Sequence, residues 1–320
     1  MAADGRDIIG EIDVAFSSAE EFGRIAMAWL TDGVRLVAGD ISDEILAGPP
    51  LKPYWHEGGG TVNEWDPAFH ARQPPLWGEI SVLYPPRNRH YWKPYSKTSL
   101  KRLEALAPVM EKATAALRKE ANDDVRKYEW NVIREGEDSG FARLMVSVNP
   151  NTDGDYAADC PEVAFMRGFA EQHDPVFGHI SYVASPSDGK TQLEQALILR
   201  PRNTLAEWDH YLRGYSWVTV IPAVLAAEIG GMRGLRDSGA FAFVDEVSGG
   251  SLWLQATRRW SEFAGDQVVV DRVFEGLAPV LPPGEPLSGL PVGISVPGVP
   301  TEVVPFLLAI RDAGEFCGRG

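Results

Sequence analysis

Residues 208–231 read WDHYLRGYSWVTVIPAVLAAEIGG, and this stretch decides the fold class of the chain. Apolar and polar residues alternate from Tyr215 to Val220, which predicts a strand that Pro222 ends. An apolar-striped helix is expected from Ala223 to Ile229. Gly230-Gly231 should stop this helix, because glycine adopts a positive φ at little cost. A strand that leads directly into a helix predicts mixed α and β structure.

The same alternation of strand and helix signals extends along the rest of the chain. Strands are predicted at 8–16, 34–41, 76–84, 128–134, 141–148, 176–183, 240–247 and 252–256, with 193–199 either a strand or a short helix. Helices are predicted at 17–30, 99–121, 160–169, 266–277 and 301–313, and Pro108 either kinks the second of them or divides it into two abutting helices. Two proline- and glycine-rich segments interrupt this order, at 48–76 and at 282–300.

Two pairs of similar short strings occur along the chain, which suggests an internal duplication. GDISD at 39–43 is similar to GHISY at 178–182, and WGEISVLYP at 77–85 is similar to YSWVTVIP at 215–222, both about 139 residues apart. A β-β-α-β-β-α order read twice predicts an α+β fold with two antiparallel sheets and helices packed on one face. Chance similarity between short apolar strings is the alternative.

This interpretation divides the chain into three parts. Residues 1–160 are expected to form an N-terminal module that carries the excursion at 48–76, and 161–284 a C-terminal module. Residues 285–320 are expected to form a proline- and glycine-rich tail with a closing helix.

Composition limits the class of protein and its partners. A net charge of −15 argues against unaided nucleic-acid binding, because phosphate contacts need clustered Lys and Arg. No apolar run approaches the ~18 residues of a membrane span, and acids stand near the N-terminus where a secretory signal carries bases. We therefore expect a cytoplasmic protein with no membrane partner. The acidity either serves solubility alone or presents an acidic face to a basic partner.

No motif in the sequence predicts catalysis, a cofactor or a metal. The chain has no phosphate-binding glycine loop, nucleophile elbow or zinc-protease motif. Cys160 and Cys317 form no metal or disulfide pattern. His173 and His179 are the only close histidine pair, but their spacing over a helix end and a strand start is not a known ligand spacing. The motifs thus indicate no active site.

Tryptophans and tyrosines are placed in two kinds of context. Trp77, Trp217 and Trp253 occupy alternating strand positions and are expected in the core. Other aromatics lie in polar, proline-rich segments, among them Trp55, Trp65, Tyr91 and Trp92. Such residues either form a protein-binding surface, where Trp and Tyr dominate the energetics, or hold long loops on the body.

The strand and helix at 208–231, the hairpin leading into SLWLQAT at 251–257, and LAPVLPPG at 277–284 resemble the C-terminal part of type VI secretion immunity-like proteins. The resemblance covers roughly residues 140–284 and rests on structural motifs. It implies a bacterial, non-enzymatic protein that binds and blocks a cognate toxin, and it brings no catalytic residues. An acidic inhibitor would suit a basic toxin such as a nuclease.

We expect an acidic, aromatic surface to bind this toxin. The predicted partner-binding residues are Trp55, His56, Glu57, Glu64, Trp65 and Asp66, with Tyr91 and Trp92 as secondary members. The alternative is an enzyme or small-ligand protein with a site between the two modules that uses His173 and His179. A scaffold role in a larger complex is a third possibility. The oligomeric state is not readable from the sequence.

Overall fold

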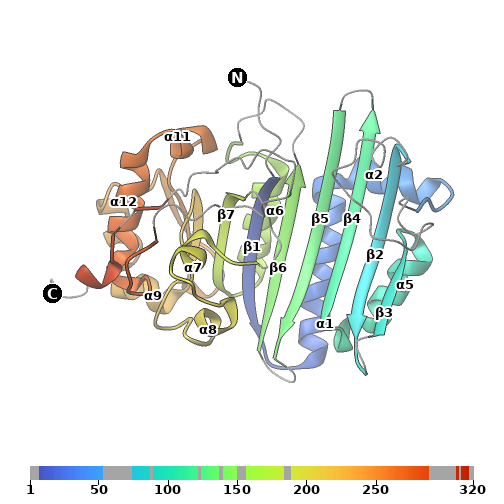
Figure 1. The fold of residues 1–320 in the computed structure, drawn as a ribbon, viewed down its shortest axis with the longest axis horizontal. Coiled ribbons are helices and arrows are strands. Elements are labelled where there is room, and N and C mark those ends of the chain that lie inside the picture. Colours follow the sequence, from blue (N-terminus) through green and yellow to red (C-terminus); the bar gives the residue numbers. More distant parts are fainter. Residues whose placement is uncertain are drawn as a thin grey trace. The chain divides into compact units, whose positions relative to one another are not determined.

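The strands belong to one ten-stranded sheet in the order β3-β2-β4-β5-β6-β1-β7-β8-β10-β9 (Figure 1). The computed structural model describes residues 7–52, 74–86, 89–121, 124–136, 140–149, 156–183, 189–287, 308–309 and 311–316. The strands are β1 Asp7–Phe16, β2 Leu76–Tyr84, β3 Arg89–Pro94, β4 Lys112–Ala121, β5 Asp124–Glu135, β6 Gly140–Asn149, β7 Pro175–Val183, β8 Val218–Ile221, β9 Phe243–Glu246 and β10 Leu252–Gln255.

Helices separate the strands along most of the chain. They are α1 Ala19–Met27, α2 Gly33–Ala47, α5 Lys97–Leu106, α6 Pro161–Gln172, α7 Gln192–Ala196, α8 Pro201–Ala206, α9 Ala223–Glu228, α10 Gly231–Asp237, α11 Trp260–Ala264 and α12 Gln267–Leu277. A π-helical turn, Ala28–Asp32, joins α1 to α2. None of the described helices is long and apolar enough to cross a membrane.

The expectation of two separate sheets built from a duplicated module is wrong, because the strands share one sheet. The similar strings explain the error. GHISY lies in β7, whereas GDISD lies inside helix α2. The same letter pattern adopts different structure because the surrounding chain decides which residues are buried. The second pair, at 77–85 and 215–222, does place a strand in each copy, but a shared strand is weak evidence of duplication.

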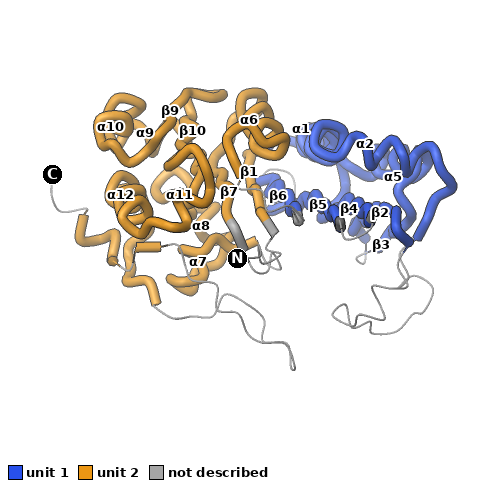
Figure 2. The backbone as a smooth tube through the Cα atoms, turned by 90° about the horizontal axis from the view of Figure 1, so that it is seen from above, with its two compact units in different colours: residues 1–5, 16–153 blue, residues 6–15, 154–320 orange. Residues whose placement is uncertain are grey.

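The chain divides into two compact units, shown in different colours in Figure 2: residues 1–5 and 16–153 form unit 1, and residues 6–15 and 154–320 form unit 2. In unit 1 the antiparallel strands β3-β2-β4-β5-β6 carry helices α1, α2 and α5 on one side (Figure 2). Every second residue of these strands is buried. Ile80 on β2, Ala115 on β4 and Trp130 on β5, for example, are cross-strand neighbours on the buried face. The residues between them, such as Thr114 and Asn131, are polar and half-buried, as expected for a sheet with one packed face.

Unit 2 contains the antiparallel strands β1-β7-β8-β10-β9, with helices on both sides (Figure 2). Every residue of β8 and β10 is buried, which fits strands covered on both faces. The predicted core positions of Trp217 and Trp253 are confirmed, and so is that of Trp77 in unit 1. The predicted stop of helix α9 is confirmed too, since Gly230 and Gly231 have φ of +84° and +62°.

Two element predictions are wrong. The segment 34–41 is not a strand but part of α2, whose buried residues Val34, Ala38, Ile41 and Ile45 follow a helical spacing. The predicted helix at 99–121 ends at Leu106, and β4 begins at Lys112. Much of the predicted tail and of the helix at 301–313 falls outside the described residues, and the described part of that helix, 308–309 and 311–313, is not α-helical.

Candidate functional site

Most of the predicted partner-binding residues lie outside the described residues: Trp55, His56, Glu57, Glu64, Trp65 and Asp66. Tyr91 and Trp92 are described, and they lie on β3 rather than in a loop. β3 is the outermost strand of the sheet on the side of unit 1. An edge strand is a surface on which another chain can dock.

Polar contacts fix the aromatic side chains on one face of β3. The indole Nε1 of Trp92 donates a 2.9 Å hydrogen bond to Oε2 of Glu79 on β2. The hydroxyl of Ser81 and Nε2 of His90 are 2.7 Å apart in a second cross-strand hydrogen bond. The rings of His90 and Trp92 stack with their centroids 5.7 Å apart. These contacts hold both rings in defined positions before any partner arrives.

The other face of β3 carries Arg89, Tyr91 and Lys93, which are opposite Tyr84, Val82 and Ile80 of β2. Arg89 and Lys93 are exposed, and Tyr91 is half-buried between them. Burial raises the pKa of Tyr91, and the positive charge of Arg102 on α5 opposes this rise. Arg102 therefore lies close enough to Tyr91 to act on it electrostatically. This links the edge strand to helix α5, which is beside it in Figure 1.

The sequence interval that contains β3 is basic, whereas the chain as a whole is acidic. No Asp or Glu occurs between Glu79 and Glu104, although the net charge of the chain is −15. The bases in this interval are Arg87, Arg89, Lys93, Lys97, Lys101 and Arg102. All of them except Arg87, which lies outside the described residues, are exposed. We call Arg89, His90, Tyr91 and Lys93 the β3 edge surface. It is basic and aromatic, whereas an acidic aromatic surface was predicted from residues 55–66.

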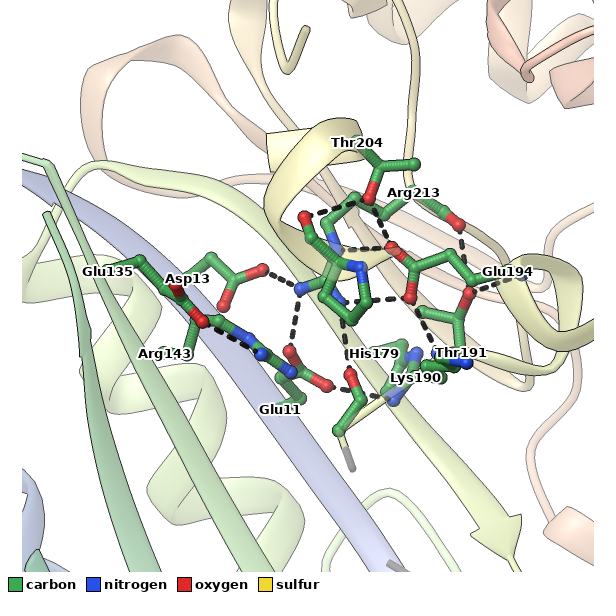
Figure 3. A network of polar contacts seen from close by, with 12 residues as sticks. Glu11, Asp13, Glu135, Arg143, His179, Lys190, Thr191, Glu194, Thr204 and Arg213 are labelled. Atoms are coloured by element: carbon green, nitrogen blue, oxygen red, sulfur yellow. Dashed lines mark hydrogen bonds and ion pairs between the residues drawn. The ribbon is translucent and has the colours of Figure 1, made fainter. Parts of the chain in front are cut away.

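A dense cluster of ionisable groups is found in the interior of unit 2 (Figure 3). Arg213 donates from Nε and Nη2 to the two carboxylate oxygens of Glu194, at 2.9 and 3.0 Å. Its Nη1 donates to Glu11 at 2.6 Å and also to Asp13. Burial alone would lower the pKa of Arg213, but Asp13, Glu11 and Glu194 raise it well above its ordinary value. The guanidinium therefore stays charged in the core.

Neighbouring strands and turns position this cluster. Glu11 on β1 is directly opposite His179 on β7, and their carboxylate and Nε2 are 3.9 Å apart. Thr191 and Glu194 cap helix α7 reciprocally, with hydrogen bonds of 2.8 and 3.1 Å. The side chains of this cluster are buried, and together they tie β1 to the segment 189–213.

The two histidines of the alternative hypothesis both lie in unit 2 and have different surroundings. His179 is buried in the cluster around Arg213, whereas His173 follows helix α6 and stacks on Phe169 with ring centroids 4.2 Å apart. Among the residues that the structure describes, no group of three or more His, Cys, Asp or Glu side chains could hold a metal ion.

The sequence matches no known family model, and no curated protein matches it either. The resemblance to type VI secretion immunity-like proteins therefore stays a hypothesis. Two features of the described structure escaped the sequence interpretation. The run without acids between Glu79 and Glu104 is readable from the letters. The second feature is also readable from the letters: Glu11 and Asp13 are two acids on the same side of an otherwise apolar strand, and such a pair indicates a buried cation nearby.

Proposed function

We propose that this protein is a non-enzymatic immunity protein that binds and neutralises a cognate toxin. The observation that carries the proposal is the aromatic edge of unit 1, where Trp92 and His90 are held by Glu79 and Ser81 on the neighbouring strand. Aromatic side chains that are already in place lose little conformational freedom when a partner binds. Trp and Tyr are also the side chains on which protein interfaces most often depend.

The construction of unit 2 supports a binding role over an enzymatic one. Its densest group of ionisable residues surrounds Arg213, and Glu11, Asp13, Glu194 and Arg213 are all buried. A buried ion cluster of this kind fixes the positions of chain segments and favours a rigid scaffold. A rigid scaffold presents a preformed surface, which suits an inhibitor.

The proposal places the protein in the cytoplasm of a bacterium and its partner-binding residues on unit 1. Tyr91 and Trp92 belong to the interface, together with Trp55, His56, Glu57, Glu64, Trp65 and Asp66. The acids among residues 55–66 suit a basic part of the toxin, and the β3 edge surface suits an acidic part. The protein would bind a partner with both kinds of charge in preference to partners with only one.

Co-expression with the product of the adjacent gene tests this proposal. That product alone should arrest bacterial growth, and co-expression of this chain should restore it. The purified proteins should form a complex of fixed stoichiometry by size-exclusion chromatography with light scattering. An adjacent product that is not toxic, or a toxin that neither binds this chain nor is blocked by it, would contradict the proposal.

A further inference from the structure

The hydrogen-bond pattern between β2 and β3 determines which backbone groups of β3 face outward. The N–H of Tyr95 donates to the C=O of Gly78 at 2.7 Å, and the two residues continue the register in which Glu79 is opposite Pro94. In an antiparallel pair, hydrogen-bonded and non-hydrogen-bonded positions alternate. The backbone groups of Arg89, Tyr91 and Lys93 therefore point toward β2. Those of His90 point to the outer side of β3, where an added strand would lie.

The outer side of β3 has a defined end. The C=O of Pro94 accepts a 2.7 Å hydrogen bond from the hydroxyl of Ser99, and proline has no N–H to offer. An incoming strand would therefore pair with the part of β3 that precedes Pro94. Arg89 and Lys93, both exposed, flank this part of β3.

We infer that the edge of β3 binds an acidic, extended segment of the partner protein, which pairs with the backbone of His90 and places its carboxylates near the exposed Arg89 and Lys93. This inference rests on the proposed function in so far as the segment belongs to the toxin. Main-chain hydrogen bonds supply affinity in strand addition, and side chains at alternate positions supply selectivity. Arg89 and Lys93 lie four residues apart on one face of β3, with Tyr91 between them, so two of the acids at alternate positions of a partner strand can lie beside these bases.

The other outermost strand of the sheet is β9. On β9, the C=O of Val244 accepts a 2.7 Å hydrogen bond from Arg236 of α10, and Asp245 pairs with Arg167 at 3.0 Å. These contacts cover β9 from within the chain. On β3 the exposed bases repel the same edge of a second copy, which is a common protection of edge strands. They attract a strand of the opposite charge.

A polypeptide suits this edge better than a nucleic acid. Charges on the rest of the chain are screened beyond about 8 Å at physiological salt, and the nearby carboxylate of Glu79 is on the opposite face of the strand pair from Arg89 and Lys93. These two bases therefore determine the attraction on their own face. A short acidic strand would contact these bases and little else. A nucleic acid carries a continuous row of phosphates, which extends into the acidic remainder of a chain of net charge −15.

Three probes of about ten residues or nucleotides test the inference on the full chain. They are a peptide with alternating Glu and Val, the same peptide with Lys in place of Glu, and a single-stranded oligonucleotide. The acidic peptide should bind, and it should slow the exchange of the His90 amide with solvent in nuclear magnetic resonance spectra. The basic peptide should not bind. An acidic peptide with proline at alternate positions should bind at least about fivefold more weakly, because it cannot form the strand hydrogen bonds.

Charge reversal locates the site. The double variant Arg89→Glu and Lys93→Glu should weaken binding of the acidic peptide at least about fivefold, since each exposed pair contributes modestly. The matched control is Arg233→Glu together with Arg202→Glu, two exposed bases on helices of unit 2, which changes the net charge equally. The control should alter binding less than about twofold.

Several outcomes would overturn the inference. Equal binding of acidic and proline-containing peptides would exclude strand addition, and preference for the oligonucleotide would identify a nucleic-acid surface instead. Loss of binding in the control but not at Arg89 and Lys93 would place the site elsewhere. A toxin complex that survives the double reversal would refute the inference and leave the proposed function standing. Peptide binding at β3 without any toxin partner would refute the proposed function alone.

Discussion

Arg213 donates two parallel hydrogen bonds to the carboxylate of Glu194, from Nε to Oε1 at 2.9 Å and from Nη2 to Oε2 at 3.0 Å. Its remaining nitrogen, Nη1, donates to Glu11 and Asp13 on β1. Arg213 therefore binds strand β1 although it lies 202 positions after Glu11 in the sequence. The guanidinium of Arg213 also lies over the ring of Phe177 on β7, with its carbon 5.1 Å from the ring centroid. This cluster holds β1 in unit 2, although α1 belongs to unit 1.

Replacement of Arg213 by Met should destabilise the protein strongly. The variant keeps the volume of the side chain but leaves Glu11, Asp13 and Glu194 buried without their cation. Removal of one partner from a buried ion pair costs about 3–5 kcal/mol of unfolding free energy. Urea unfolding of the variant, followed by circular dichroism, would measure this loss. Arg233→Met, at a fully exposed position, should change the unfolding free energy by less than about 0.5 kcal/mol. A variant at Arg213 with wild-type stability would show that the cluster does not hold the fold.

Tyr215 should make the stability of the protein sensitive to alkaline pH. Its buried hydroxyl accepts a 2.9 Å hydrogen bond from the N–H of Ala309, and burial raises the pKa of Tyr215 well above its ordinary value. A raised pKa means that the stabilisation is fully present below the unfolded value, near 10, and is lost as the pH rises through the folded pKa.

Comparison of wild type with Tyr215→Phe isolates this effect, because all other tyrosines are common to both proteins. At neutral pH the variant should be less stable by about 1 kcal/mol, for the lost hydrogen bond. Above about pH 10 the wild type should lose up to about 1.4 kcal/mol per pH unit through Tyr215, and the difference between the two should shrink and then reverse. Urea unfolding between about pH 8 and 11 would show this. A difference that stays constant with pH would contradict the prediction.

The sequence predicts elements well where local signals agree with the tertiary environment. The hairpin of β5 and β6, helix α6, strand β7 and helix α12 are at their predicted places. β4 was missed because its sequence, KATAALRKEA, is rich in residues that favour helix, whereas its neighbours β2 and β5 place it in a sheet. The pairing of β1 with β7 joins segments far apart in the sequence, and no local pattern encodes it.

The candidate site was predictable only in part. Tyr91 and Trp92 stand out by their aromatic character, but their surrounding charge was assigned from the composition of the whole chain. A net charge of −15 does not describe a stretch of 24 residues without a single acid. The contacts of Trp92 with Glu79 and of His90 with Ser81 depend on strand register, which the sequence alone did not determine.

A side chain at Gly78 should destabilise the protein, because Leu117 and Tyr95 pack directly against this glycine. A Cβ at this position would lie 2.7 Å from Cδ2 of Leu117 and 2.9 Å from Cβ of Tyr95. Gly78→Ala should therefore lower the unfolding free energy by about 1–3 kcal/mol. Gly168→Ala is the matched control: it lies inside α6 with no atom within 4 Å of its Cβ, and should stabilise the protein by about 0.5–1 kcal/mol. Thermal unfolding of both variants would measure the two effects, and equal shifts would contradict this account of the packing.

Trp55 and Trp65 remain predicted members of the toxin interface. Each alanine substitution should weaken the complex by about 1–2 kcal/mol if the ring is buried by the partner. Isothermal titration calorimetry with the purified toxin would measure the affinity, and circular dichroism would confirm that each variant is folded. Unchanged affinity in two folded variants would remove both tryptophans from the interface.

Trp92 tests whether the aromatic edge of unit 1 takes part in partner binding. Trp92→Ala removes the ring and its hydrogen bond to Glu79, and should weaken the toxin complex by about 2 kcal/mol or more, roughly 30-fold. Trp92→Phe keeps an aromatic ring but loses the indole donor, so its affinity should fall by about 1 kcal/mol. Ile198→Ala, at an apolar side chain of unit 2 that is 72% exposed, should leave affinity unchanged. Equal effects of Trp92→Ala and Ile198→Ala, in folded proteins, would mean that the partner does not contact β3. A loss in Trp92→Ala that Trp92→Phe largely restores would show that the ring itself is buried against the toxin.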